Sequence, residues 1–352
     1  MLALCAAAAA TALVAAAAAE STPSRRLESP RLAEIARAAG PIPDATGSLH
    51  LLGLLAPGTY WGGAYRTPSG ESVTVYASNS YPVDPALGQR WADFLASLVH
   101  GSELSSIRVF LAPPAQVARI CGTDAVACYS RAERALLAPG EDPDSSLSAE
   151  AVITHEYGHH VAANRSNAPW AAIDYGPKRW ASSIRVCARA RSDELAPGAE
   201  DPVRYEVNPG EGWAETYRLL NERRRGVPET AWQVVSSALY PDATALAAAD
   251  QDVTSPWSQG AATSRRGTLT RTSRSRTYTI ATQLDGTLNV TLRPSARTRL
   301  ALDVYASSTR LVHAVGARTL SRSTTICGQR SLRIRVSAVL GRGTFQLAVS
   351  KP

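Results

Sequence analysis

The residues of this chain best suited to chemistry are His155, Glu156 and His159, which form an HExxH run. On an α-helix, residues four apart project from the same face, so both imidazoles can bind one metal ion. The carboxylate of Glu156 is then placed to accept a proton from the water that a zinc ion activates. The run therefore predicts a catalytic Zn²⁺ site with His155 and His159 as ligands and Glu156 as the general base.

The residues around this run predict a helix. Ser148 can cap the N-terminus, Glu150 suits the first turn because of the helix dipole, and residues 164–169 indicate the end. Unpaired imidazoles would be costly to bury on so apolar a helix, and a metal ion removes that cost. The alternative is a surface helix that carries these histidines by chance. His160 lies about 100° around the helix from His159, so we expect it to pack or to face solvent.

A catalytic zinc site takes three protein ligands and leaves a fourth position for water. The chain lacks the HExxHxxGxxH continuation, because Ala162 and Arg165 occupy the required Gly and His positions. The best third ligand is Glu211, at the start of a helix predicted from residue 211. Glu215 follows one turn later on the same face and is expected to accept the free N–H of a ligating histidine. The alternative for both residues is a solvated acidic helix start, which the helix dipole favours.

The pair of motifs HEYGH and EGWAE resembles the gluzincin metallopeptidases, in which a second helix supplies a glutamate as the third zinc ligand. This resemblance implies that His155, His159 and Glu211 bind zinc. It also implies that Glu156 is the general base and that Glu215 orients a histidine. The resemblance covers two short helices. A stretch of 51 residues separates His159 from Glu211, longer than the usual spacing of the family, so it must be an insertion that returns the chain to the site.

Two assignments stay open at this point. Asp174, in an Ile-Asp-Tyr-Gly run that faintly resembles the aspzincins, is an alternative third ligand. Glu211 is preferred because it lies on a predicted helix and has a partner carboxylate. For the group that stabilises the oxyanion, Tyr217 is the first candidate, and Tyr205 and Tyr175 are the others.

The N-terminus indicates export. Residues 1–19 are nearly all Ala, Leu and Val and end in three alanines, which is typical of a signal peptide, although a basic start is missing. An uncleaved membrane anchor is the alternative. Residues 20–48 are rich in Pro, Ser and Arg and predict a linker or a short pro-segment. We therefore expect the protein to be secreted or associated with a bacterial cell envelope.

Four cysteines follow the predicted signal peptide, and an even count in an exported chain favours disulfides. Cys121 and Cys128 enclose a short loop and are the expected pair. Cys187 and Cys327 would then join the insertion to the C-terminal region. Three pairings are possible in principle, and the sequence does not choose among them. A structural zinc site is disfavoured, because there is only one close pair and its spacing does not suit zinc.

Charge divides the chain into two parts. Residues 262–352 hold 15 Arg and one Lys against Asp285 and Asp303, a net charge of +14, whereas the whole chain carries +7 and residues 1–261 therefore −7. A length of 352 residues also suggests two domains. We predict a catalytic domain at 49–261 and a basic domain at 262–352.

The basic domain has the pattern of a β-sandwich. Short alternating segments are separated by turn residues, at Tyr278–Ile280, Leu288–Leu292, Leu300–Tyr305, Leu332–Val336 and Phe345–Val349. Their order, with the motifs GTLxVTL, LxLDVY and GxFxLxV, resembles the bacterial pre-peptidase C-terminal domain. That resemblance implies a module that accompanies secreted peptidases. The many arginines add the hypothesis that this domain binds an anionic cell-envelope polymer.

The segment before the HExxH run fits the small mixed sheet of a zincin-like domain. Residues 72–76 and 107–111 predict strands on either side of an amphipathic helix near 85–99. Residues 126–129 predict an edge strand near the active helix. Such an edge binds extended peptides through backbone hydrogen bonds, so a peptide or protein is the expected substrate.

Together these features predict an α+β zincin-like catalytic domain, with a small mixed sheet, an HExxH helix and a second Glu-bearing helix, followed by an all-β sandwich domain. The expected function is that of a secreted, monomeric zinc metallopeptidase. The sequence shows no motif for nucleic-acid binding, no phosphate-binding glycine loop and no serine or cysteine nucleophile motif. The alternative is a non-catalytic envelope-binding protein with a structural metal site.

Overall fold

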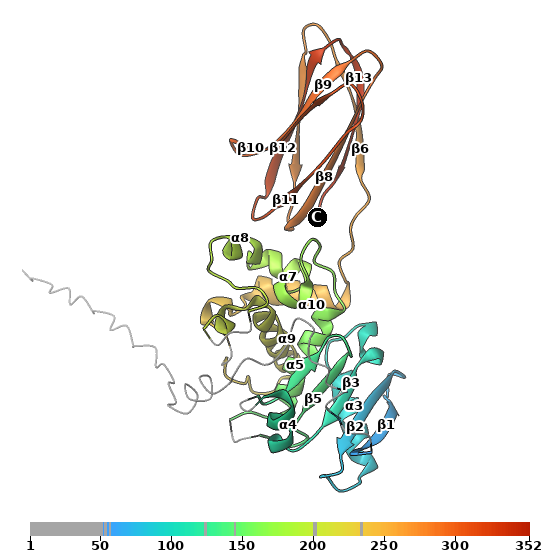
Figure 1. The fold of residues 1–352 in the computed structure, drawn as a ribbon, viewed down its shortest axis with the longest axis vertical. Helices are drawn as coiled ribbons and strands as arrows, with labels where there is room; N and C mark the ends of the chain where they lie inside the picture. Colours follow the sequence, from blue (N-terminus) through green and yellow to red (C-terminus); the bar gives the residue numbers. More distant parts are fainter. Residues whose placement is uncertain are drawn as a thin grey trace, which may run out of the picture.

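A computed structural model describes residues 52, 55, 58–122, 125–143, 146–199, 203–232 and 235–352. The predicted signal peptide and the predicted linker or pro-segment lie outside these residues. Within the described ranges, no helix is both long and apolar enough to cross a membrane. The described chain forms a helical part with a mixed sheet, followed by two antiparallel sheets, as Figure 1 shows. The predicted order of an α+β part and a β-sandwich is confirmed.

The first sheet has five strands in the order β1-β2-β3-β5-β4. Neighbours β2, β3 and β5 run parallel, whereas β1 and β4 are antiparallel strands at the two edges. The predicted strands at 72–76 and 107–111 are confirmed, and the predicted edge strand is β4, displaced by one to two residues. The strands are β1 Tyr60–Arg66, β2 Ser72–Ser78, β3 Arg108–Leu111, β4 Cys128–Ser130 and β5 Ala135–Ala138.

Helices pack on this sheet and on one another around a core that includes Trp180, Trp213, Tyr157 and Tyr217, all almost fully buried. The predicted helix near 85–99 is α3. The helices are α3 Pro85–Ser97, α4 Pro114–Cys121, α5 Ala149–Ala163, α6 Ala172–Tyr175, α7 Lys178–Ser183, α8 Val186–Arg191, α9 Pro209–Arg225 and α10 Ala243–Thr254. Short 3₁₀ turns lie at Ser102–Ser106, Tyr205–Val207 and Ser237–Leu239.

The C-terminal part consists of two four-stranded antiparallel sheets, in the orders β10-β9-β12-β7 and β11-β8-β13-β6. Their inner faces share a separate core of Leu, Val, Ile and Phe side chains. All five strands predicted from the sequence are present, as parts of β7, β8, β9, β12 and β13. The strands are β6 Thr263–Leu269, β7 Ser275–Ala281, β8 Gly286–Pro294, β9 Arg299–Ala306, β10 Thr309–Gly316, β11 Leu320–Ile326, β12 Ser331–Leu340 and β13 Gly343–Ser350.

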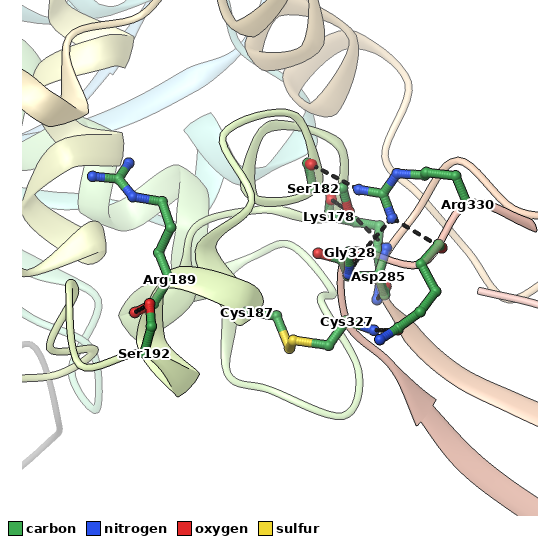
Figure 2. Close-up of a disulfide and its surroundings, with 10 residues drawn as sticks. Lys178, Ser182, Cys187, Arg189, Ser192, Asp285, Cys327, Gly328 and Arg330 are labelled. Carbon is green, nitrogen blue, oxygen red and sulfur yellow. Dashed lines mark hydrogen bonds and ion pairs between the residues drawn. A yellow bond between two sulfur atoms is a disulfide. The ribbon is translucent and has the colours of Figure 1, made fainter. Parts of the chain in front are cut away.

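Both expected disulfides are formed. Cys121–Cys128 joins the end of α4 to the edge strand β4. Cys187–Cys327 links α8, in the insertion between the two site helices, to the end of β11 in the sandwich, and Figure 2 shows this link. The second bond is a covalent connection between the helical part and the sandwich in addition to the chain itself.

Polar contacts surround the Cys187–Cys327 bond. The buried ammonium of Lys178 donates to the backbone carbonyls of Ala168 (2.6 Å) and Asp285 (2.9 Å). Asp285 accepts from the guanidinium of Arg330 at 2.6 Å, and its own amide donates to the hydroxyl of Ser182 at 2.9 Å. Gly286 permits the close approach, since its φ is +142° and a Cβ there would lie 2.8 Å from the Lys178 nitrogen. The disulfide and these hydrogen bonds together hold the near end of the sandwich on α7 and α8.

Replacing Cys187 and Cys327 by serine is expected to loosen the sandwich while both cores stay folded, because each part has its own core. A disulfide typically contributes about 2–4 kcal/mol, so non-specific proteases should cut the connecting residues 255–262 roughly tenfold faster or more. Limited proteolysis with mass spectrometry measures this rate. The matched control replaces Cys121 and Cys128 by serine and should leave that cut unchanged. Equal cutting in all three proteins would contradict the expectation.

Candidate metal centre

Two helices deliver the candidate site, and each begins at a capped residue. The hydroxyl of Ser148 accepts from the amide of Ala151 at 3.1 Å and starts α5, as predicted. The side-chain oxygen of Asn208 accepts from the amide of Gly210 at 2.9 Å and starts α9. This second helix therefore begins at Pro209, two residues before the predicted start, because Asn208 caps it and proline suits the first helical position.

α5 and α9 lie very close together beside the site. A Cβ at Gly158 would lie 3.0 Å from the Cα of Ala214, so a larger residue would push the helices apart. The indole nitrogen of Trp213 donates to the Gly158 carbonyl at 2.8 Å and fixes this approach. The glycine inside the HExxH run is thus what lets α9 bring its carboxylates to the histidines of α5.

The predicted ligands meet between these helices. Oε2 of Glu211 lies 3.2 Å from Nε2 of His155 and 3.3 Å from Nε2 of His159. The three residues are buried, and one ligand atom from each lies within 4.8 Å of the others. Ligand atoms about 2.0–2.1 Å from a tetrahedral zinc ion are separated by about 3.3 Å. The nitrogen and oxygen donor set and the distances from Glu211 to the two histidines therefore fit a bound metal ion.

A row of charged side chains contacts His155 on the side of its Nδ1 atom. Oε1 of Glu215 lies 2.9 Å from Nδ1 of His155 and can accept a hydrogen bond from it, which leaves Nε2 available to bind a metal. Arg218 donates to both oxygens of Glu215, at 3.0 and 2.6 Å, and to Glu222 at 2.8 Å. All these side chains are buried, so the arginine balances two carboxylates that would otherwise be costly to bury.

The electrostatics of the site favour a positive charge between the carboxylates. Burial alone would lower the pKa of His155, but its contacts with Glu211 and Glu215 outweigh burial and raise it to about 10. Burial opposes ionisation of Glu215, yet His155 and Arg218 lower its pKa to about 2. The pKa of Glu211 is also lowered, because both histidines outweigh its burial. A proton or a metal cation is strongly attracted to this position.

Glu156 lies beside this cluster without a protein partner for one of its oxygens. Its Oε2 is buried and has no hydrogen-bond partner within the described residues. Burial raises the pKa of this carboxyl, and the neighbouring His155 and His159 partly offset that increase. A buried carboxylate oxygen that the protein leaves unpaired is suited to binding a water molecule and accepting its proton.

The structure separates the three tyrosine candidates. Tyr217, the first choice from the sequence, is not at the site, because its hydroxyl donates to the Val99 carbonyl at 2.5 Å. Tyr175 stacks on Trp170, with ring centres 5.5 Å apart. Tyr205 lies beside the Glu211 carboxylate, and burial together with that negative charge raises its pKa well above the usual value. Tyr205 therefore replaces Tyr217 as the candidate hydroxyl donor.

Two further residues have clear positions. His160 lies 3.0 Å from the hydroxyl of Tyr129 and 3.0 Å from the Glu103 carbonyl, and burial lowers its pKa to about 4. It packs in the core, as predicted. Asp174 lies on α6 and is not part of the group of potential ligands that the described residues form. The structure therefore brings Glu211, and not Asp174, to the two histidines.

Arg218 and Glu222 were not predicted from the sequence. Arg218 follows Glu215 by three residues and precedes Glu222 by four, so all three share one face of α9. An arginine spaced in this way between two acids on the predicted helix was the available signal. The position of Tyr205 could not be predicted from such a spacing, because Tyr205 lies on a 3₁₀ turn near the end of the insertion and not on either site helix.

No protein-family model matches the chain, and no curated protein sequence does either. Several solved structures are similar to about a quarter of it. The pre-peptidase C-terminal domain of a collagenase from Bacillus anthracis is 12% identical, covers 25% of this chain and 89% of that chain, and has a TM-score of 0.23. A mitogen from Yersinia pseudotuberculosis is 10% identical, with coverages of 26% and 86% and a TM-score of 0.21.

PliG from Aeromonas hydrophila, a periplasmic inhibitor of g-type lysozyme, is 14% identical, with coverages of 26% and 85% and a TM-score of 0.21. Likenesses with such low TM-scores carry no argument about function.

Replacing Glu211 by alanine is expected to remove one of three ligands and to weaken Zn²⁺ binding at least about a hundredfold. Titration of the metal-free protein with Zn²⁺, followed by calorimetry, measures the affinity. Asp174→Ala is the matched control and should bind zinc as tightly as the wild type. Full zinc occupancy in Glu211→Ala together with loss in Asp174→Ala would overturn the ligand assignment.

Replacing Glu215 by glutamine is expected to weaken Zn²⁺ binding about 10- to 100-fold, because the amide orients and polarises the His155 ring less well. The same titration measures this, and circular dichroism confirms that the variant folds. Glu222→Gln, which touches Arg218 but no histidine, should have a much smaller effect. Equal effects of the two substitutions would show that Glu215 acts only through the stability of α9.

Proposed function

We propose that this protein is a secreted zinc metallopeptidase with a zincin-like catalytic domain. The observation that carries the proposal is the convergence of His155, His159 and Glu211 beside the unpaired carboxylate oxygen of Glu156. A zinc ion held by these three residues would polarise the substrate carbonyl and make water acidic enough to be deprotonated at neutral pH. The resemblance of the two motifs to the gluzincins supports the same assignment.

The residues of this chain have separate roles in that reaction. Glu156 accepts the proton of the attacking water as its oxygen bonds to the peptide carbonyl carbon. The same carboxyl then donates this proton to the amide nitrogen as the C–N bond breaks, so that a carboxylic acid and an amine leave. Glu215 and Arg218 keep His155 in the orientation that binds the metal. The hydroxyl of Tyr205 is the candidate donor to the oxygen that becomes negative.

The strand next to the site favours an extended peptide as substrate. β4 is an edge strand of the mixed sheet, and α5 packs against it. An edge strand can in general pair with an extended chain through its backbone, and the Cys121–Cys128 bond fixes the position of β4, whose three residues are buried. The two disulfides and the N-terminal composition support activity outside the cytoplasm.

Replacing Glu156 by glutamine is expected to lower the rate of peptide cleavage by a factor of about 10² to 10⁴ while zinc stays bound, because the amide cannot accept a proton. Casein and a peptide library are suitable substrates, and zinc content is measured by mass spectrometry. His160→Gln is a control on the same helix that should retain activity if it folds. If wild type and Glu156→Gln each bind one zinc ion and neither cleaves any substrate, the protein is a non-catalytic metal protein.

A further inference from the structure

One end of the β-sandwich points away from the helical part. β6 leaves the helical part at Thr263, and Cys327 and the C-terminus lie at that same near end, as Figure 1 shows. Because successive strands alternate in direction, the connections β6–β7, β8–β9, β10–β11 and β12–β13 all lie at the opposite end. We call this surface the distal end and define it as residues 270–274, 295–299, 317–319 and 339–342.

The distal end carries only positive charge. Its six arginines are exposed, and within the described residues none of them has an ion-pair partner: Arg271, Arg274, Arg297, Arg299, Arg318 and Arg342. The two acids of the sandwich are elsewhere. Asp285 pairs with Arg330 at the near end, and Asp303 lies within β9 beside His313. The excess charge that the sequence shows is therefore concentrated at the end most accessible to a large partner.

The same end exposes two aliphatic side chains. Val339 is 45% and Leu340 is 67% exposed, and they form two of the five large hydrophobic residues that are exposed in the described chain. Leu340 lies opposite Arg299 in the sheet. The turn that follows uses Gly341, whose φ is +75°, so Val339 and Leu340 are the last two residues of β12 before the hairpin folds back.

A hollow lies in the surface beside the distal end. It has a volume of about 650 Å³ and is lined by Arg266, Arg276 and Arg293, by Thr, Ser and Gln side chains and by the apolar side chains of Pro294 and Phe345, and no carboxylate lines it. The strand register explains the arrangement, because Gln346 on β13 lies opposite Arg266 on β6 and Arg293 on β8. Guanidinium groups that flank amide and hydroxyl side chains can bind an anionic group of the size of a phosphodiester.

We propose that the distal end docks on a lipid bilayer that contains anionic phospholipids. The arginines would contact the lipid phosphates, the hollow would hold a headgroup, and Val339 and Leu340 would enter the boundary of the hydrocarbon layer. Charge alone would equally suit a soluble anionic polymer. The exposed pair Val339 and Leu340 at the end of β12 favours the bilayer, because a hydrated polymer offers these side chains no apolar environment.

Cosedimentation of the full-length mature protein with vesicles tests this proposal. We expect binding to vesicles of phosphatidylcholine with phosphatidylglycerol and little binding to phosphatidylcholine alone. Arg297→Glu with Arg342→Glu should weaken binding at least about tenfold, since each surface arginine contributes about a factor of five. The matched control, Arg265→Glu with Arg333→Glu, changes the net charge equally on strands away from the distal end and should retain binding.

A second pair of substitutions separates a bilayer from a polymer. Val339→Ser with Leu340→Ser keeps every charge and should weaken vesicle binding several-fold at moderate salt. The proposal is overturned if the wild type ignores anionic vesicles, or if the control pair weakens binding as much as the distal pair. It is also overturned if the serine pair has no effect while polygalacturonate displaces the protein from vesicles, because the partner is then a polymer. Glu156→Gln should bind vesicles like the wild type, so this result does not depend on peptidase activity.

Discussion

The structure of the helical part depends on one contact, the Glu211 carboxylate held between the imidazoles of His155 and His159. These groups are buried, and bringing them together requires two helices to approach more closely than ordinary side chains allow. Gly158 makes that approach possible, and the Trp213 indole closes it with a hydrogen bond. The caps at Ser148 and Asn208 then set where each helix begins and hence which residues face the site.

The site can bury so many charged side chains because positively and negatively charged groups alternate along one row. The carboxylate of Glu215 supports His155, the guanidinium of Arg218 supports Glu215, and Glu222 completes the row. Removing Arg218 would leave two buried carboxylates without the guanidinium that balances them, which is far more costly than removing a surface charge. Two groups among the acids and histidines of the site are exceptions in the described chain, because one oxygen of Glu156 and the Nδ1 atom of His159 have no hydrogen-bond partner. An unpaired oxygen such as that of Glu156 is expected where a protein keeps a group available for a ligand.

Much of this arrangement could be predicted from the sequence. The HExxH spacing, the Ser148 cap and the paired acids at 211 and 215 are local patterns. Such patterns predict the geometry of a single helix without knowledge of the tertiary structure. Four of the five missed strands had weaker patterns. β1 contains two adjacent glycines, and β5 is buried along its whole length, without alternation. Strands β6 and β11 are polar edge strands of the sandwich, so they lack the alternating apolar residues of the central strands.

The positions of the tyrosines could not be predicted, because they depend on how distant segments meet. Tyr217 lies on the helix that carries Glu211, yet its hydroxyl is directed to Val99. Tyr205 is separated from the histidines by most of the insertion, and only the folding of the chain brings it close to the acids of the site. A spacing pattern within one helix carries information about that helix alone, so it cannot rank these two residues.

The Cys187–Cys327 disulfide and the hydrogen bond from Lys178 to Asp285 attach the sandwich to the helical part at more points than the connecting chain alone. A ten-residue strand such as β12 spans about 33 Å, so the two ends of the sandwich are separated by several nanometres. A surface bound at the distal end would therefore lie at a fixed distance from the two histidines and in a fixed orientation to them. Reach would then become a criterion for selecting substrates: chains that extend far enough from the anchoring surface would be cut, and those lying flat on it would be spared.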